Sequence, residues 1–212
     1  MAKTTKGKYF NADNIEVPRF SKIIDILGLN KGGLIGWAYK RGKEGKPLRD
    51  QEALDVGTIV HEWVNTDIQG QPVSHLPAPP LELKDRIENG YLAWLEWKDM
   101  NKFELLASEI PLVSEEFQFG GTIDIVAIVK GLPSIIDIKT GDTYLEHRIQ
   151  IRAYATLWNE HNFDRKIQSY YLLRLGKDDG GFSYHYYPSG LDKEWEIFKH
   201  LLEIERLIRN LK

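Results

Sequence analysis

The chain has 212 residues, of which 42% are hydrophobic, and its 28 basic and 31 acidic residues give a net charge of −3. This length and apolar content fit one well-packed domain spanning residues 1–212. The charge argues against a protein that coats long duplex DNA, because such proteins carry a basic surface. No run of about 18 apolar residues indicates a membrane span. The absence of cysteine fits a reducing cytoplasm, and the basic start lacks the apolar stretch of a secretory signal.

The first half of the chain reads as mostly helical. Residues 1–14 are polar and expected to be loose and flexible. An N-terminal helical segment over 15–50 follows, with helices predicted over 19–27 and 31–41. A further helix is predicted over 51–68, with Asp50 as its cap. Residues 69–80 contain four prolines and predict a loop, and residues 81–102 predict a long helix.

The second half reads as a sheet with helices around it. Strands are predicted over 110–113, 116–129, 134–139, 167–175 and 181–188, and helices over 146–160 and 191–212. Two hairpins join neighbouring strands, one through residues 130–133 and one through residues 177–180. The expected fold is therefore α/β, with a mixed central β-sheet flanked by helices.

Three charged residues lie inside the predicted strands. Asp124, Asp137 and Lys139 stand among Ile and Val residues, where burial is costly unless the charges are paired or bind a metal. If Gly131 and Leu132 form the hairpin tip, Asp124 lies opposite Lys139 and diagonal to Asp137, so all three share one face. A three-residue tip would turn Asp124 to the other face.

Two neighbouring carboxylates repel each other unless a cation lies between them. Oxygen ligands suit Mg²⁺ or Mn²⁺, and Lys139 could then orient the attacking water and offset charge on a phosphate. A buried Asp–Lys salt bridge that only holds the hairpin is an equally good interpretation of the triplet from Asp137 to Lys139.

Two predicted helices carry further polar pairs. Gln150 and Tyr154 are spaced i, i+4 and share a helix face, and so do Gly57 and His61. A glycine inside a helix is unfavourable by about 1 kcal/mol relative to alanine. Close approach of another backbone, or of a substrate, would explain Gly57.

In this order and spacing, the motifs together resemble the PD-(D/E)XK nuclease superfamily, in particular its RecB-like, phage-type exonuclease branch. The matching positions are Gly57 and His61, Glu109, Gly121 and Asp124, Asp137 and Lys139, and Gln150 and Tyr154, with a similar opening over 18–24 and 34–38. The resemblance implies a restriction-endonuclease-like core and a metal-dependent DNA nuclease.

The resemblance also implies a role for each position. The metal ligands, for one or two Mg²⁺ or Mn²⁺ ions, would be His61, Asp124, Asp137, the backbone carbonyl of Ile138 and, for a second ion or its water, Glu109. Lys139 would be the catalytic lysine, and Gln150 and Tyr154 would position the scissile phosphate. The iron–sulfur cluster of some relatives is excluded, because the chain has no cysteine.

Other interpretations of single residues stay open. Glu109 could be an exposed glutamate at a strand edge, and Trp158 is expected in the core. A zinc-protease helix fails at His61-Glu62, because Asn65 stands where a second histidine is needed. Four further histidines show no mutual metal spacing and are expected on the surface: His147, His161, His185 and His200.

Basic residues beside aromatic ones are candidates for contact with DNA, either a single strand or a duplex end. They are Trp37, Lys40 and Arg41 in the N-terminal segment, and Arg148 and Arg152 on the helix that carries Gln150. The resemblance implies an exonuclease from a phage or prophage module for DNA recombination and repair, with a phage recombination protein as a partner, and its expected location is the cytoplasm. The alternatives are a non-catalytic nucleic-acid-binding or assembly subunit with the same fold, and a domain whose Asp–Lys cluster is only structural. Oligomeric state is left open.

Overall fold

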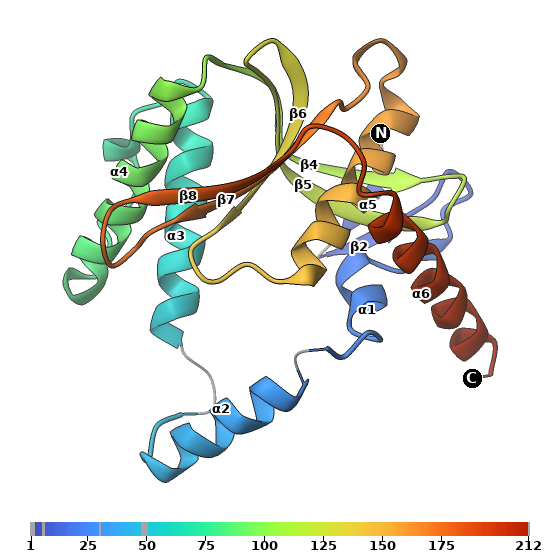
Figure 1. The fold of residues 1–212 in the computed structure, drawn as a ribbon, viewed down its shortest axis with the longest axis horizontal. Coiled ribbons are helices and arrows are strands. Elements are labelled where there is room, and N and C mark those ends of the chain that lie inside the picture. Colours follow the sequence, from blue (N-terminus) through green and yellow to red (C-terminus); the bar gives the residue numbers. More distant parts are fainter. Residues whose placement is uncertain (1–2, 6, 30, 48–50, 212) are drawn as a thin grey trace.

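The computed structural model describes residues 3–5, 7–29, 31–47 and 51–211, and a five-stranded sheet lies at its centre (Figure 1). In spatial order the strands are β4 (Phe103–Ser114), β5 (Phe119–Val129), β6 (Leu132–Lys139), β7 (Ser169–Leu175) and β8 (Phe182–Tyr187). β6 and β7 are parallel, and the other neighbouring pairs are antiparallel. The predicted mixed sheet is confirmed, and it is consistent with a restriction-endonuclease-like core.

Helices cover both faces of this sheet. The connection from β6 to parallel β7 is α5 (Leu145–His161), which packs with α1 (Phe20–Ile24) and α6 (Asp192–Asn210) around one apolar core. The second core lies between the sheet and the pair α3 (Gln51–Ile68) and α4 (Lys84–Met100). Figure 1 shows the two helix groups on opposite sides of the strands. Trp158 is buried in the first core, as expected.

The hairpin between β5 and β6 turns one position earlier than predicted. Its tip is Lys130 and Gly131, with φ values of 51° and 87°, and Val129 pairs with Leu132. Two positive φ values match the twist that a two-residue hairpin requires. The pairing shifts by two residues relative to the expected one, so the parity is unchanged. Asp124 therefore faces Asp137 rather than Lys139, one pair beyond Ile125 and Ile136.

The N-terminal segment is more ordered than its composition indicates. Three short strands, β1 (Lys3–Thr5), β2 (Lys8–Phe10) and β3 (Glu16–Val17), form a separate sheet. Tyr9 is buried, and its hydroxyl lies 2.8 Å from Thr122 Oγ1 in β5. The prediction of a loose segment is wrong for β1 and β2, and β3 lies in the segment that was predicted to be helical. These strands dock on the main sheet because Tyr9 and Val17 are buried against Val113 of β4, and Asn11 donates a hydrogen bond to Gln118.

Predicted helix ends agree with the structure within a few residues. The helix α2 spans Lys31–Lys43, and α3 has the predicted bounds, whereas its expected cap Asp50 lies outside the described residues. A 3₁₀ turn at Leu81–Leu83 precedes α4, and two others occur at Val73–His75 and Phe163–Arg165. In Figure 1, α2 lies beyond the N-terminal end of α3, away from the sheet.

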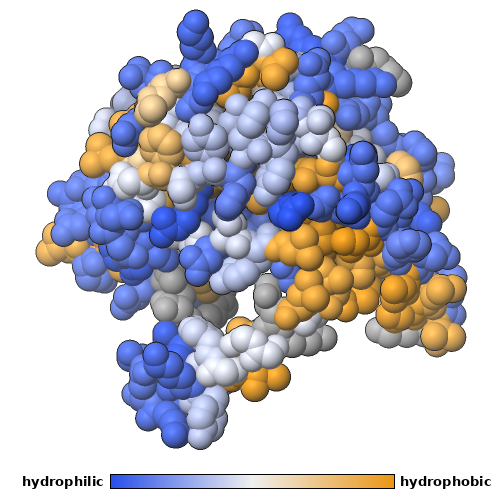
Figure 2. Space-filling view, viewed as in Figure 1, coloured by the Kyte–Doolittle hydropathy of each residue, from blue (hydrophilic) through white to orange (hydrophobic). Residues whose placement is uncertain are grey.

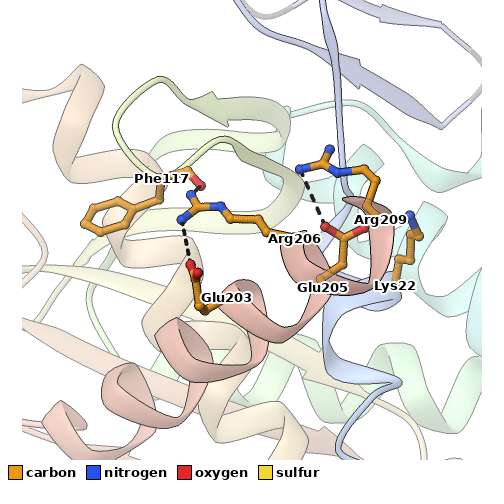
Figure 3. Close-up of polar contacts among 6 residues, drawn as sticks. All are labelled: Lys22, Phe117, Glu203, Glu205, Arg206 and Arg209. Atoms are coloured by element: carbon orange, nitrogen blue, oxygen red, sulfur yellow. Dashed lines mark hydrogen bonds and ion pairs between the residues drawn. The ribbon is translucent and has the colours of Figure 1, made fainter. Parts of the chain in front are cut away.

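A buried glutamate, Glu205, connects the C-terminal half of α6 to α1. Glu205 accepts a hydrogen bond from Lys22 at 2.8 Å and lies 3.7 Å from Arg209. Arg206 donates to the carbonyl of Phe117 at 2.7 Å (Figure 3). Figure 2 shows apolar surface over α1 and the end of α6. On α6 the exposed apolar side chains are Ile204, Leu207, Ile208 and Leu211.

Candidate active site

Three carboxylates occupy neighbouring positions on β4, β5 and β6. The pairs Ser108–Ile125 and Ile110–Ile123 bracket Glu109 and Asp124, so these two residues face each other across β4 and β5. On the other side of β5, Asp124 faces Asp137. Three acidic residues therefore form a row across the strands, at a position where the sheet is otherwise apolar.

The helix α3 adds an imidazole to this row. His61, Glu109 and Asp124 each offer a ligand atom, and these atoms lie within 4.8 Å of one another. His61 Nδ1 is 4.0 Å from Asp124 Oδ2, which also accepts a hydrogen bond from the Ile138 N–H at 3.2 Å. The structure thus brings together three of the predicted ligands, His61, Glu109 and Asp124.

Glu109 adopts a strained backbone conformation. Its φ is 46°, in the left-handed region that a non-glycine residue rarely adopts and that costs about 1–3 kcal/mol. Such outliers persist only where the surrounding structure holds them. Here the paired residues on either side, Ser108 and Ile110, hold it. The distortion sets the Glu109 carboxylate against Asp124 and His61.

Asp137 interacts most closely with Lys139. Lys139 Nζ lies 2.7 Å from Asp137 Oδ2, and the Asp137 side chain is 2% exposed. This contact has the distance of an ion pair, and the second oxygen, Asp137 Oδ1, is buried with no hydrogen-bond partner among the described residues. A buried carboxylate with an unsatisfied oxygen is costly, so Asp137 has unused capacity to bind a cation.

Burial and mutual repulsion perturb the titration of the cluster. Burial, together with the charge of Asp137, raises the pKa of Asp124 to about 8. Glu109 is an exposed residue, and its partial desolvation raises its pKa. The pKa of His61 is lowered by burial and then by the charge of Lys139. Burial alone would lower the pKa of Lys139, but Asp137 and Asp124 outweigh it and raise the pKa. These pKa shifts favour a neutral His61 imidazole and a charged Lys139. The positive charge of Lys139 does not balance the neighbouring carboxylates, so the cluster is short of positive charge.

These residues fit a divalent metal ion. Carboxylate oxygens with one imidazole suit Mg²⁺ or Mn²⁺. The unsatisfied Oδ1 of Asp137 and the raised pKa of Asp124 both indicate a site that a cation would stabilise. Deprotonated carboxylates and a neutral imidazole are the forms that bind metal.

The cluster opens into a cleft of about 650 Å³. Its lining is Leu54, Gly57, Thr58, His61, Glu62, Asn65, Glu109, Asp124 and Thr140. A Cβ atom on Gly57 would lie 3.1 Å from Thr140 Oγ1, just after Lys139. Close approach therefore accounts for the glycine inside α3. The approaching group is a side chain, however, and not the backbone or substrate that the sequence analysis expected.

The helix α5 brings Gln150 and Tyr154 to the same region. Burial, and then the charges of Asp124 and Asp137, raise the pKa of Tyr154, while Gln150 acts in the opposite direction. A Cβ atom on Gly121 would lie 2.4 Å from Tyr154 Cε1, and one on Gly120 would lie 2.4 Å from the Tyr9 ring. The two glycines thus make room for two aromatic rings. The sequence analysis did not identify Tyr9, because residues 1–14 were expected to be loose.

The residues predicted to contact DNA lie on two helices, α5 and α2. Arg148 pairs with Glu194 and lies 5.5 Å from the Tyr187 ring, and Arg152 lies 4.9 Å from the Trp195 ring. The structure therefore engages both arginines with β8 and α6 and does not bring them to the cluster. Their spacing of two residues from Gln150 turns them to another side of the helix.

Trp37, Lys40 and Arg41 all lie on α2. Lys40 is exposed, Trp37 is 39% exposed, and Arg41 Cζ lies 5.0 Å from the Trp37 ring centroid. Lys43 makes a similar contact with Tyr39 at 5.2 Å. These aromatic–cation pairs stand apart from the carboxylate cluster, on the segment that leads into α3.

His147 is nearer to the cluster than its sequence context predicts. The expected position was the surface, but His147 is partly buried, and Lys139 and Asp137 both influence its pKa. Its spacing of three residues from Gln150 was the available signal, because i, i+3 places both on one helix face.

Comparison with known families agrees with this geometry. A family model described as the PD-(D/E)XK nuclease superfamily matches residues 35–205 of the 212. No curated protein sequence matches the chain significantly. Within the described ranges, none of the helices combines the length and apolar character that crossing a membrane requires.

Proposed function

Because the chain belongs to the PD-(D/E)XK nuclease superfamily, we propose that it is a metal-dependent exonuclease that hydrolyses phosphodiester bonds from DNA ends. The observation that carries the proposal is the convergence of His61, Glu109 and Asp124 beside the Asp137–Lys139 pair. Both apolar cores share one sheet, which supports a single nuclease domain.

The side chains of the cluster have separate roles in this proposal. His61, Asp124 and Asp137 would hold one or two Mg²⁺ or Mn²⁺ ions, with the Ile138 carbonyl as a further ligand and Glu109 for a second ion or its water. The metal would supply a water of lowered pKa and would polarise the scissile phosphate. Lys139, kept charged by two carboxylates, orients the attacking water and offsets charge on the phosphate. Gln150 and Tyr154 hold the phosphate or the nucleotide beside it.

The helix α2 supplies the contact with the strand in this proposal. Residues 31–47 hold five basic residues and one acidic residue, a net charge of +4 in a chain whose total is −3. Trp37 offers a ring for stacking bases, and Lys40 and Arg41 offer charges for phosphates. From its start at Gln51 to His61, α3 covers about 15 Å at 1.5 Å per residue, and Leu54 in this stretch lines the cleft.

The preference for DNA ends and the setting in phage recombination and repair are the finer part of the proposal. They are supported by the resemblance of residues 18–24 and 34–38 to phage-type exonucleases. In this setting, the expected partner is a phage recombination protein.

Digestion of end-labelled DNA tests the proposed activity. The purified protein is incubated with Mn²⁺ and linear, circular and single-stranded DNA, with chelator and Lys139→Ala as controls. We expect linear molecules to shorten while circles stay intact. Cleaved circles would contradict the requirement for ends. Binding without any metal-dependent cleavage would instead favour a non-catalytic subunit with the same fold.

A further inference from the structure

His147 lies on the face of α5 that meets the cluster. His147, Gln150 and Tyr154 are spaced i, i+3 and i+7, so their side chains follow one stripe along the helix. Tyr154 is packed against Gly121 of β5. The stripe therefore runs from the sheet towards the N-terminal turn of α5, and His147 occupies the end of it.

The connection from β6 places this turn at the same sheet edge as Lys139. β6 ends at Lys139, residues 140–144 follow, and α5 begins at Leu145. Because α5 joins two parallel strands, its N-terminus lies at the carboxyl end of β6. Substrates of open α/β sheets bind outside the carboxyl ends of the strands. His147 thus stands at the edge where Lys139 would meet a phosphate.

A hydrogen bond fixes the orientation and the tautomer of the imidazole. The Tyr144 N–H donates to His147 Nδ1 at 3.1 Å, and the two rings lie 5.7 Å apart. Since Nδ1 accepts, the proton of the neutral ring is on Nε2. Among the described residues, Nε2 has no hydrogen-bond partner in the structure. Burial lowers the pKa of His147, and the charge of Lys139 lowers it further, so the neutral form is favoured.

We propose that His147 Nε2–H donates a hydrogen bond to a phosphate oxygen of the DNA strand bound at Lys139, and so positions the substrate. This inference rests on the proposed nuclease function and adds a residue to it. A neutral donor suits this place, because a second cation beside Lys139 would be repelled. His147 lies outside the group formed by His61, Glu109 and Asp124, which argues for a contact with the substrate rather than with metal.

The capping hydrogen bond allows a matched variant. Glutamate is an ordinary residue at the third position of a helix, where its side chain accepts from the backbone N–H of the cap residue. His147→Glu therefore keeps the bond to Tyr144 and has no N–H to donate. His147→Ala removes both the donor and the bond to Tyr144, so a lower melting temperature is expected for His147→Ala than for His147→Glu.

Steady-state cleavage of end-labelled DNA with Mn²⁺ tests the proposal. Removing a hydrogen bond to a charged group predicts a KM raised by about tenfold or more in His147→Glu, with kcat changed much less. Cleavage is then measured on a series of DNA substrates, each with one methylphosphonate linkage at a different position. At one position the linkage should slow the parent protein and should not slow His147→Glu, because the glutamate has no N–H to donate to that phosphate.

Three outcomes are distinguishable. A parent that cleaves, with a parental KM for His147→Glu, overturns the inference and leaves the nuclease function standing. The inference is also overturned if parent and variant are equally sensitive to methylphosphonate at every position, because a merely structural histidine would behave so. A parent that fails to cleave any DNA with Mn²⁺ overturns the proposed function and this inference together.

Discussion

Lys139 Nζ lies 2.7 Å from Asp137 Oδ2 at the carboxyl end of β6, where Asp137 is almost fully buried and Lys139 is 22% exposed. Lys139 engages one carboxylate oxygen, and the other, Oδ1, has no hydrogen-bond partner among the described residues, so Asp137 keeps capacity for another partner. A pair that served only to hold the hairpin would be expected to satisfy those oxygens. The arrangement is better explained by an ammonium group held beside a site for a second cation.

Replacing Lys139 should affect activity and stability in different ways. Lys139→Ala removes a charged donor from the reaction, and a loss of roughly 10²–10⁴-fold in kcat is expected. It also leaves Asp137 buried without its cation, which costs about 3–5 kcal/mol in metal-free protein. Mn²⁺ should restore much of that stability and none of the activity. Urea unfolding and DNA cleavage, each with Mn²⁺ or chelator, measure the two effects.

A second lysine gives the matched control. Lys98 Nζ on α4 also lies 2.7 Å from a carboxylate oxygen, that of Asp67, and neither residue lines the cleft. Lys98→Ala should lower stability, while the folded protein cleaves DNA at the parental rate. Equal loss of cleavage in the two variants would mean that Lys139 acts only through the fold.

The stability of metal-free protein should fall as the pH rises. The pKa of Asp124 is raised from 3.8 to about 8, so the folded state holds a proton that the unfolded state releases. This contribution is fully present below about pH 4 and is lost progressively as the pH rises through about 8. Asp124→Asn, which never ionises, should flatten this part of the profile. Urea midpoints between pH 5 and 9 with chelator measure it, and a parent profile as flat as that of Asp124→Asn would contradict the assignment.

The strain at Glu109 can be tested by comparing two small residues. Glycine tolerates the φ of 46° and alanine does not, so Glu109→Gly should be more stable than Glu109→Ala by about 1 kcal/mol. This reverses the usual order in a strand, where glycine is the weaker residue. Both variants lack the carboxylate and should bind Mn²⁺ more weakly than the parent. Equal stability of the two variants would show that the strand relaxes, and that the left-handed backbone is not held in place.

The proposed role of α2 predicts a change in salt dependence. Removing one contact between a basic side chain and a phosphate reduces the slope of log K against log salt by about 1, so Lys40→Ala should reduce this slope for DNA binding. Trp37→Ala should weaken binding to single strands with little change in slope, since stacking carries no charge. Arg152→Ala is the control, because its guanidinium lies over Trp195. A reduced slope in Arg152→Ala alone would move the contact from α2 to α5.

Much of the fold was predictable because local patterns agree with the tertiary structure. The bounds of α3 and the parity of the β5–β6 hairpin follow from apolar periodicity and turn residues. The tip of this hairpin is Lys130 and Gly131 rather than the predicted Gly131 and Leu132, because Leu132 and Pro133 belong to β6. The order of β1–β3 was not predictable, since it depends on the fit of Tyr9 over Gly120, far along the chain.

The site was predictable in part for the same reason. Asp124, Asp137 and Lys139 stood out as charges in apolar strands, and His61 stood out through Gly57. The left-handed conformation of Glu109 arises from pairing on both sides of it, which no short motif encodes. Arg148 and Arg152 looked like DNA contacts, because a sequence does not show that α6 and β8 cover that side of α5.

Anomalous scattering from a crystal soaked in Mn²⁺ tests the central claim most directly. The account predicts a manganese peak within coordination distance of His61, Glu109 or Asp124, extending to Asp137, and its loss in Asp124→Asn crystals. Ordered Asp124 and Asp137 carboxylates with no peak beside them, at Mn²⁺ concentrations that support DNA cleavage, would contradict it.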